Sequence, residues 1–254
     1  MILRRVISHF RKQEWTAIGI DFVIVVIGVF MGIQLGNWNQ AFGDRARESA
    51  YLDQLVDDLN ADFRKMDLVT KAARDTMSVI KVVLERAGKG PPPKSFYLPD
   101  CVYQPCTGDV IFAAAETSIV DQPFAANDVL STKREFVPVR NTYDALISTG
   151  DIGLLRNENL ARKVQAYYAN AIEAQNLDGA INDNFRHLND TRHGLGIAVA
   201  GASLDDLIDA VRTSPKFAAQ LRSQFAYSGF QIRAMTNTRR LANELVAEIE
   251  ETKK

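Results

Sequence analysis

WTAIGIDFVIVVIGVFMGIQLGNW, residues 15–38, is the stretch that decides the fold of this 254-residue chain. The 22 residues between its two tryptophans would reach about 33 Å as a helix, which is enough to cross the hydrocarbon layer of a bilayer. Twelve of them are Ile, Leu, Val or Phe. Their insertion, at roughly −0.3 to −0.6 kcal/mol each, outweighs the cost of about 3 kcal/mol for Asp21. We therefore predict a transmembrane helix over residues 16–37, with Trp15 and Trp38 as membrane-interface anchors, because indole rings favour the headgroup level.

The flanks of this segment predict its orientation. Arg4, Arg5, Arg11 and Lys12 precede it against a single acid, whereas residues 44–62 hold two basic and six acidic side chains. Basic flanks stay in the cytoplasm. A cleaved signal peptide is the alternative, but the apolar core is long for one and no A-x-A pattern follows it. We therefore expect an uncleaved single-pass anchor with its N-terminus in the cytoplasm.

Glycines mark one face of the predicted span. Gly28, Gly32 and Gly36 recur every four residues, and Asp21 falls near the same stripe. Such a face lets two helix backbones approach closely. Asp21 has no Lys or Arg three or four positions away, so a charged partner for it would come from another chain. These four residues form the predicted helix–helix interface, although glycine is also common in membrane helices that make no such contact.

The segment VVIGVFMGIQLGNWNQA, residues 25–41, together with the acid shortly before it, resembles the N-terminal anchor of a group of uncharacterised bacterial single-span proteins. These proteins are grouped only as a domain of unknown function. A second stretch, NTYDALISTGDIGLLRNENLARKVQAYY at residues 141–168, is similar to a helix end in the same family. Asp21 stands where the family pattern has Glu. The resemblance implies a membrane address, a helical domain and no known activity. With the orientation predicted from the flanks, we expect the bacterial inner membrane, with the C-terminal domain in the periplasm.

Long helices dominate the rest of the chain. Apolar side chains recur at steps of three and four over residues 44–87, 157–193 and 215–250, whereas no alternating strand pattern is present. Asp58 and Asp62 are placed on the polar faces of the first of these helices. Helices of matched length pack most simply as an antiparallel bundle. The predicted fold class is all-α: a transmembrane helix followed by an extracytoplasmic long-helix bundle with one irregular insertion that contains Pro and Cys.

The predicted domains are a cytoplasmic basic stub at residues 1–15, the span, and an extracytoplasmic helical domain at residues 38–254. Its irregular segment, residues 88–137, holds six of the eight prolines and both cysteines, with a short helix expected over residues 108–118. Cys101 and Cys106 are predicted to form a disulfide if this side of the membrane is oxidising, and to be reduced thiols if the orientation is reversed.

Few residues suggest chemistry. Asp183, His187 and Asp190 share one helix face and are the weak candidates for a metal site, but their spacing matches no named motif. The chain has no GxSxG, no CxxC and no P-loop. We therefore expect no catalytic residues, no cofactor and no bound metal.

Charge limits the partners. Residues after Trp38 hold 26 basic and 29 acidic side chains, so no basic field for nucleic acid exists. The expected partners are the lipid bilayer and either a second copy of the chain or another membrane protein. The leading hypothesis is a non-enzymatic, membrane-anchored helical interaction module. The alternatives are a ligand-sensing ectodomain that acts through a partner, since helical bundles bind small molecules between helices, and a metal-dependent enzyme.

Overall fold

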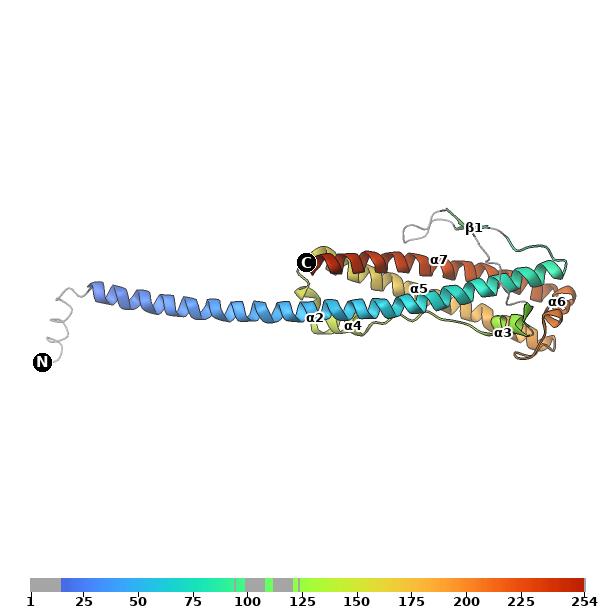
Figure 1. The fold of residues 1–254 in the computed structure, drawn as a ribbon, viewed down its shortest axis with the longest axis horizontal. Coiled ribbons are helices and arrows are strands. Elements are labelled where there is room, and N and C mark those ends of the chain that lie inside the picture. The colour runs from blue at the N-terminus through green and yellow to red at the C-terminus, as the bar shows by residue number, and fades with distance from the viewer. Residues whose placement is uncertain (1–14, 94, 99–107, 112–120, 123, 254) are drawn as a thin grey trace. The chain divides into compact units, whose positions relative to one another are not determined.

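A computed structural model of the protein describes residues 15–93, 95–98, 108–111, 121–122 and 124–253 (Figure 1). The chain divides into two compact units, Met1–Tyr51 and Leu52–Lys254. Nearly all of the described elements are helices, and one pair of short strands is the exception.

Helix α2, Trp15–Arg86, unites the predicted span and the first predicted bundle helix in one element of 72 residues. The helix continues through Gly43 without a break. Its end follows the prediction. Gly88 has φ 73°, its N–H donates to Glu85 O, and the N–H of Lys89 donates to Leu84 O. These two bonds form a Schellman cap, for which glycine is suited because the left-handed conformation costs it little.

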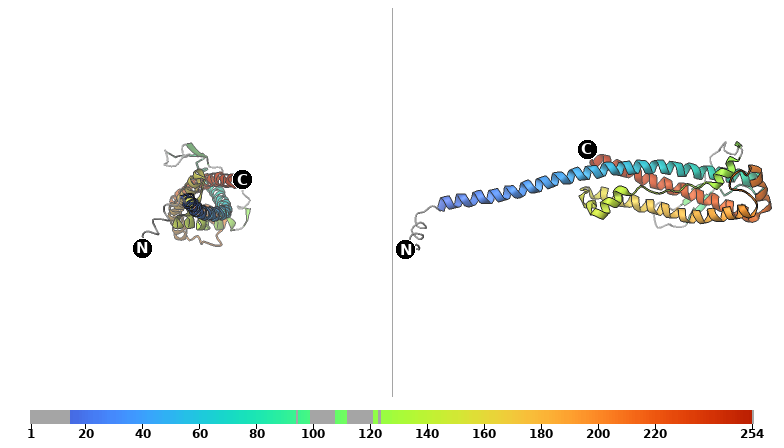
Figure 2. Two further views of the ribbon diagram at one scale, coloured as in Figure 1. Left: turned by 90° about the vertical axis from the view of Figure 1, so that its left-hand side faces the viewer. Right: turned by 90° about the horizontal axis from the view of Figure 1, so that it is seen from below.

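Three long helices lie side by side in the second unit (Figures 1 and 2). The first is the C-terminal part of α2. The second is α5, Glu158–Gly194, and the third is α7, Pro215–Thr252. Helix α7 runs opposite to α5, since Asn157 Nδ2 donates to Thr252 Oγ1 at one end and Gln220 Nε2 donates to His187 O at the other. Helices α2 and α5 run in the same direction, so the simple antiparallel arrangement expected from the sequence is incomplete.

The parallel pair exists because the chain returns along the bundle between α2 and α5. After α3, Ala125–Ser131, residues 132–140 form no helix or strand and run along the bundle to α4, Asn141–Thr149 (Figure 1). We call residues 132–140 the strap. Nine residues in extended form cover about 30 Å, a distance that a helix of the same length would not reach. The short 3-10 helix η2, Asp151–Leu154, then connects α4 to α5.

Polar pairs set the register between α5 and α7. Side chains seven residues apart on α7 meet partners on α5 through hydrogen bonds of 2.7–2.9 Å: Gln224 with Asn184, Gln231 with Asp178, and Thr238 with Asn170. Each pair is at least partly buried, so a slip of the helices would leave its polar atoms without partners, at a cost of about 1–3 kcal/mol per group. The sequence-based reading had placed only apolar side chains in this interface.

Residues with capping chemistry begin and end the shorter elements. Gly150 ends α4 with φ 77°, and Asn157 accepts hydrogen bonds from the first N–H groups of α5. Ser203 and Asp206 form a capping box at α6, Leu204–Thr213. Ser214 caps α7, and Pro215 occupies its first turn. These side chains satisfy backbone donors that a helix start leaves without an intrahelical acceptor.

The irregular segment contains two strands that the sequence did not predict. Strand β1, Ser95–Leu98, pairs antiparallel with β2, Gly108–Ile111, with Phe96 opposite Val110. The helix expected over residues 108–118 is therefore wrong at its start. The alternation of this segment is too short to be separated from a helical pattern by periodicity.

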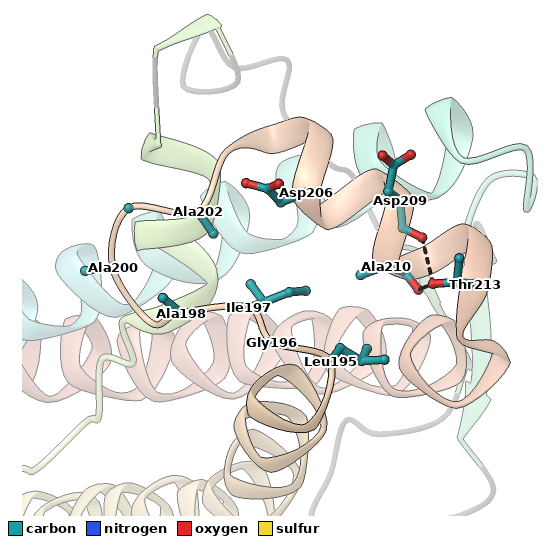
Figure 3. A pocket seen from close by; sticks show the side chains of 11 residues that line it. Leu195, Gly196, Ile197, Ala198, Ala200, Ala202, Asp206, Asp209, Ala210 and Thr213 are labelled. Atoms are coloured by element: carbon teal, nitrogen blue, oxygen red, sulfur yellow. Dashed lines mark hydrogen bonds between the residues drawn. The ribbon is translucent and has the colours of Figure 1, made fainter.

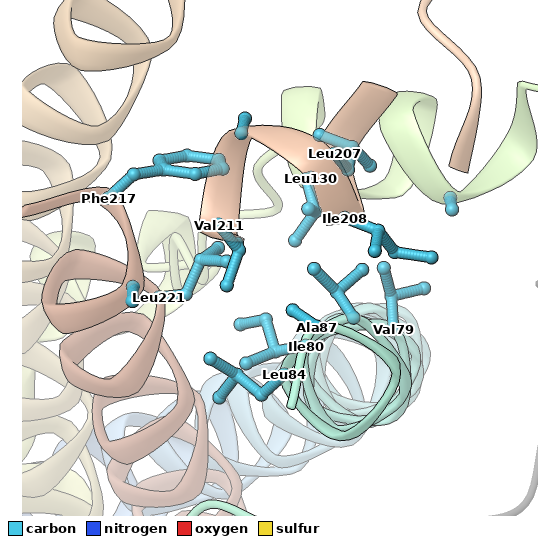
Figure 4. Close-up of a cluster of buried hydrophobic side chains, with 14 of the residues drawn as sticks. Val79, Ile80, Leu84, Ala87, Leu130, Leu207, Ile208, Val211, Phe217 and Leu221 are labelled. Carbon is cyan, nitrogen blue, oxygen red and sulfur yellow. The ribbon is translucent and has the colours of Figure 1, made fainter. Parts of the chain in front are cut away.

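The largest apolar cluster lies where α2, α3, α6 and α7 meet (Figure 4). Helix α6 turns Leu207, Ile208 and Val211 toward the end of α2 and the start of α7. Each fully buried side chain of this kind contributes about 1.5–3 kcal/mol relative to an exposed one. This core positions the loop between α5 and α6.

Candidate functional site

The first unit presents a long run of exposed apolar side chains. Of the described residues, one helix, α2, contains a segment long and apolar enough to cross a membrane. Its side chains are about half to two-thirds exposed: Ile20, Phe22, Val23, Ile24, Val25, Val26, Ile27, Val29, Phe30, Met31, Ile33 and Leu35. Exposed apolar runs of this size are unusual on soluble proteins and mark surfaces that contact lipid or another protein.

The predicted glycine face is an exposed surface of this helix. Gly28, Gly32 and Gly36 lie in one continuous helix, so their four-residue spacing places them on one side. A Cβ atom built on any of them would meet nothing within 4 Å. Asp21 is exposed as well. The face is therefore available for contact with another molecule, whereas the interface itself stays a prediction.

The remaining predicted site residues lie elsewhere. Trp38 is exposed, and Trp15 begins α2. The predicted disulfide falls outside the described residues, which resume after Leu98 only at Gly108.

The weak metal candidates do not come together. Asp183, His187 and Asp190 are exposed on α5, and Asp183 pairs with Arg186. His187 and Asp190 border an open hollow of about 650 Å³ that Asp183 does not reach. Within the described ranges, no group of three His, Cys, Asp or Glu side chains is placed to hold a metal ion.

Carboxylates that hold the strap are the main polar feature of the bundle. Asp178 Oδ2 accepts from Phe136 N at 2.8 Å, and Asp62 Oδ1 accepts from Val139 N at 2.8 Å. Asp58 Oδ2 accepts from Thr142 N at 3.1 Å in the first turn of α4. An extended segment outside a sheet has no ladder partners for its N–H groups, so side-chain acceptors must replace them. Carboxylates form the stronger, charge-assisted version of this bond.

Asp62 is completely buried, contrary to its predicted place on a polar face. Its Oδ2 accepts from the hydroxyl of Tyr167 at 2.7 Å. Burial raises the pKa of Asp62, and the bonds from Tyr167 and Val139 oppose the rise. Burial and the adjacent Asp62 carboxylate raise the pKa of Tyr167. Tyr168 packs edge-on against Tyr167 and stacks on Tyr143 with ring centroids 4.3 Å apart. The cluster joins α2, α4, α5 and the strap.

Arg192 forms a second buried polar centre at the far end of α5. Its guanidinium is completely buried and donates to neutral acceptors, including Ser131 Oγ at 2.9 Å, Asn189 Oδ1 at 3.1 Å and the side chain of Asn127. Burial lowers its pKa. Asn127 Nδ2 also donates to the carbonyls of residues 198 and 199. Arg192 and Asn127 therefore fix the loop between α5 and α6 against α3.

Residues 195–203, which connect α5 and α6, border a hollow of about 490 Å³ (Figure 3). Leu195, Ile197 and Ala198 form one side of it, and Asp206 and Asp209 of α6 stand on the other. The backbone N–H and the hydroxyl of Ser203 both donate to Asp206 and lower the pKa of its carboxyl group. The hollow can accept an apolar group that carries positive charge, but no described residue around it forms a catalytic constellation.

Sequence reasoning missed the buried polar residues because it assigned polar side chains to solvent. One signal could have found them. Buried positions on α2 alternate by three and four residues, and this spacing includes Asp62 among apolar neighbours: Leu52, Leu55, Leu59, Asp62, Met66, Val69 and Ala73. Asp178 and Arg192 fall on the same kind of stripe on α5.

Comparison with known protein families gives a match to a family of unknown function (DUF6090) over residues 21–87. The match runs from Asp21 through the apolar segment to the end of α2, and it includes the anchor segment on which the resemblance was based. The second stretch of that resemblance, residues 141–168, lies outside it. No curated protein and no solved structure matches the chain. Over about a quarter of its length, the chain is therefore similar to an uncharacterised family.

Proposed function

We propose that the protein is a non-enzymatic, single-pass membrane-anchored interaction module that self-associates, or docks on another membrane protein, through the glycine face of α2. The observation that carries the proposal is the exposed apolar run of α2 with Gly28, Gly32 and Gly36 on one side. Two helices can approach closely along such a face, and packing and weak hydrogen bonds hold them together in lipid.

The basic flank supports a cytoplasmic N-terminus in the bacterial inner membrane and a periplasmic bundle. In this arrangement the bundle is the part that meets other periplasmic surfaces. Its described residues include no group of three His, Cys, Asp or Glu side chains placed to hold a metal ion, so the proposal assigns the bundle a binding role. Family similarity adds no activity, since the matched family has none assigned.

The test is cross-linking of the full chain in its native membrane. Wild-type protein is expected to give a homodimer or one constant partner, and Gly32→Ile is expected to lose that species because the added side chain separates the helices. A Cβ atom at this position meets nothing within 4 Å in the protein's own chain, so loss of the cross-link reports an external contact.

A matched control is Phe30→Ile, on the opposite side of the helix, which should leave the cross-link unchanged. Both variants should enter the membrane equally. A wild-type protein that stays monomeric without partners, or a cross-link equally strong in Gly32→Ile, contradicts the proposal.

A further inference from the structure

The end of the bundle formed by α3, α6 and the loop between α5 and α6 exposes apolar side chains. Phe124, Leu195 and Val199 are 47%, 39% and 44% exposed. Together with the adjoining hollow of about 490 Å³, we call these three residues the tip surface. The rest of the loop is small: Gly and Ala account for five of the residues 196–202. A partner backbone could therefore approach closely.

Phe124 adopts a backbone conformation that few residues other than glycine favour. Its φ is 65°, and it is the only non-glycine residue with positive φ among those the structure describes. A bulky side chain in this region is strained. The strain is not repaid by burial, since the ring remains about half exposed. Strained residues concentrate at sites where the exposed group has a use.

The loop is held so that its carbonyls face inward. Asn127 Nδ2 donates to Val199 O at 2.8 Å, and Ser131 Oγ donates to the same oxygen at 2.9 Å. Arg192 Nη2 donates to Ala198 O at 3.4 Å. Because these bonds fix the backbone, the tip surface is formed before any partner arrives, and preorganisation lowers the entropy cost of binding.

The segments of the tip surface carry more acidic than basic side chains. Basic neighbours outside these segments include Lys216, which borders the next hollow with Leu195, and Arg192, which is buried beneath the loop. Residues 121–131 and 195–213 hold five aspartates, Asp121, Asp128, Asp205, Asp206 and Asp209, against one arginine. All five are exposed. The arginine, Arg212, bonds to Asp209 and to Arg86 O at the C-terminal end of α6. An acidic rim repels anionic surfaces and attracts basic ones.

We infer that the tip surface binds a segment of another protein that carries both apolar and basic side chains. The apolar groups would contact Phe124, Leu195 and Val199, and the basic groups would lie on the aspartate rim, with one long side chain entering the hollow between the loop and α6. This inference rests on the proposed function for its docking role, but it uses a different surface from the glycine face, so either can fail alone.

The experiment uses the full chain in nanodiscs of zwitterionic lipid, with empty discs as the background. The probe is a fluorescent synthetic peptide of alternating Leu and Lys, and the matched peptide replaces Lys with Glu. We expect the Lys peptide to bind and the Glu peptide not to bind. Raising the ionic strength to roughly 1 M, where the Debye length is about 3 Å, should weaken binding of the Lys peptide.

Two variants test the two halves of the surface. Asp121→Asn, Asp128→Asn and Asp205→Asn together should lower the affinity for the Lys peptide about tenfold and reduce its salt dependence. The matched control changes three exposed acids elsewhere, Asp57, Glu250 and Glu251, to their amides and should change little.

Phe124→Asn separates function from folding. Asn tolerates positive φ far better than Phe, so the melting temperature should stay equal or rise while the affinity for the Lys peptide falls. The control Leu68→Ser, which removes an exposed apolar side chain from α2, should not affect binding. Equal binding of both peptides, or unchanged affinity in both tip variants, overturns the inference. A cross-link through the glycine face would survive that result.

Discussion

Asp62 is a carboxylate in a position that the helix pattern reserves for apolar side chains. It is fully buried, yet Val139 N and Tyr167 Oη donate to it. Burying an ionised carboxylate costs free energy that its hydrogen bonds only partly offset, which is why its pKa is raised. Removing the acceptor would leave two donors without a partner, at about 1–3 kcal/mol each.

The pH dependence at Asp62 has a definite sign. Its folded-state pKa is raised, so the folded state binds the proton more readily than the unfolded state, and stability increases as pH falls through the folded-state pKa toward 3.8. Asp62→Asn mimics the protonated side chain, so its stability relative to wild type should be highest at neutral pH and decline on acidification. Urea unfolding at several pH values measures this. Stability of Asp62→Asn relative to wild type that rises as pH falls contradicts the assignment.

Glu248 is shifted in the opposite direction. Lys163 and Asn157 donate to it, and these bonds lower the pKa of Glu248 to about 2. A depressed pKa contributes stability above the unfolded value of 4.5, and this contribution is lost as pH falls toward 2. Glu248→Gln should therefore be less stable than wild type at neutral pH. The difference should shrink as pH falls from 4.5 toward 2. A pH-independent difference in urea unfolding would show that the pair acts by packing alone.

At the scale of elements, the sequence predicted most helices because apolar spacing and caps agree. Gly88, Gly150, Asn157 and Ser203 each end or begin a helix where their chemistry indicates. The buried stripe of α7 shows what the sequence could not reveal. Polar residues share its three–four spacing with apolar ones: Phe217, Leu221, Gln224, Ser228, Gln231, Met235, Thr238, Ala242, Leu245 and Ile249. Their burial depends on partners from α5, which are distant in sequence.

The strap is the element that sequence reasoning could not identify. Its residues have neither helical periodicity nor a strand partner, and two of its N–H groups bond to aspartates 42 and 77 residues away. Such contacts depend on tertiary structure, so local propensity cannot reveal them. The parallel direction of α2 and α5 follows from the strap and was missed for the same reason.

Adjacent strap positions should respond very differently to truncation. Phe136 is fully buried, whereas Val137 is 49% exposed, as expected for an extended segment whose successive side chains point to opposite sides. Phe136→Ala should lower the free energy of unfolding by about 3–5 kcal/mol, and Val137→Ala should change it by about 0.5 kcal/mol or less. Chemical denaturation of both variants tests the placement. Equal losses would mean that the strap is shifted by one residue.

At the scale of the molecule, the chain comprises an apolar unit and a helical bundle unit. Sequence alone identified the apolar segment and its glycines, because membrane-spanning composition is a local property. It did not identify the buried acids, Arg192 or the tip surface, which are formed by residues from three or more elements. The proposed functions therefore fall on both units: a helix face for association in lipid, and a bundle end for a basic apolar partner.

The proposed function requires that α2 lies in a membrane and that the bundle lies on the opposite side of this membrane from the N-terminus. Reporter fusions after Lys254 measure this directly in cells. A phosphatase that is active only outside the cytoplasm should be active in this fusion, and a fluorescent protein that matures only in the cytoplasm should stay dark. An inactive phosphatase fusion together with a bright fluorescent fusion would contradict this topology. Recovery of the protein in the soluble fraction would contradict the membrane placement.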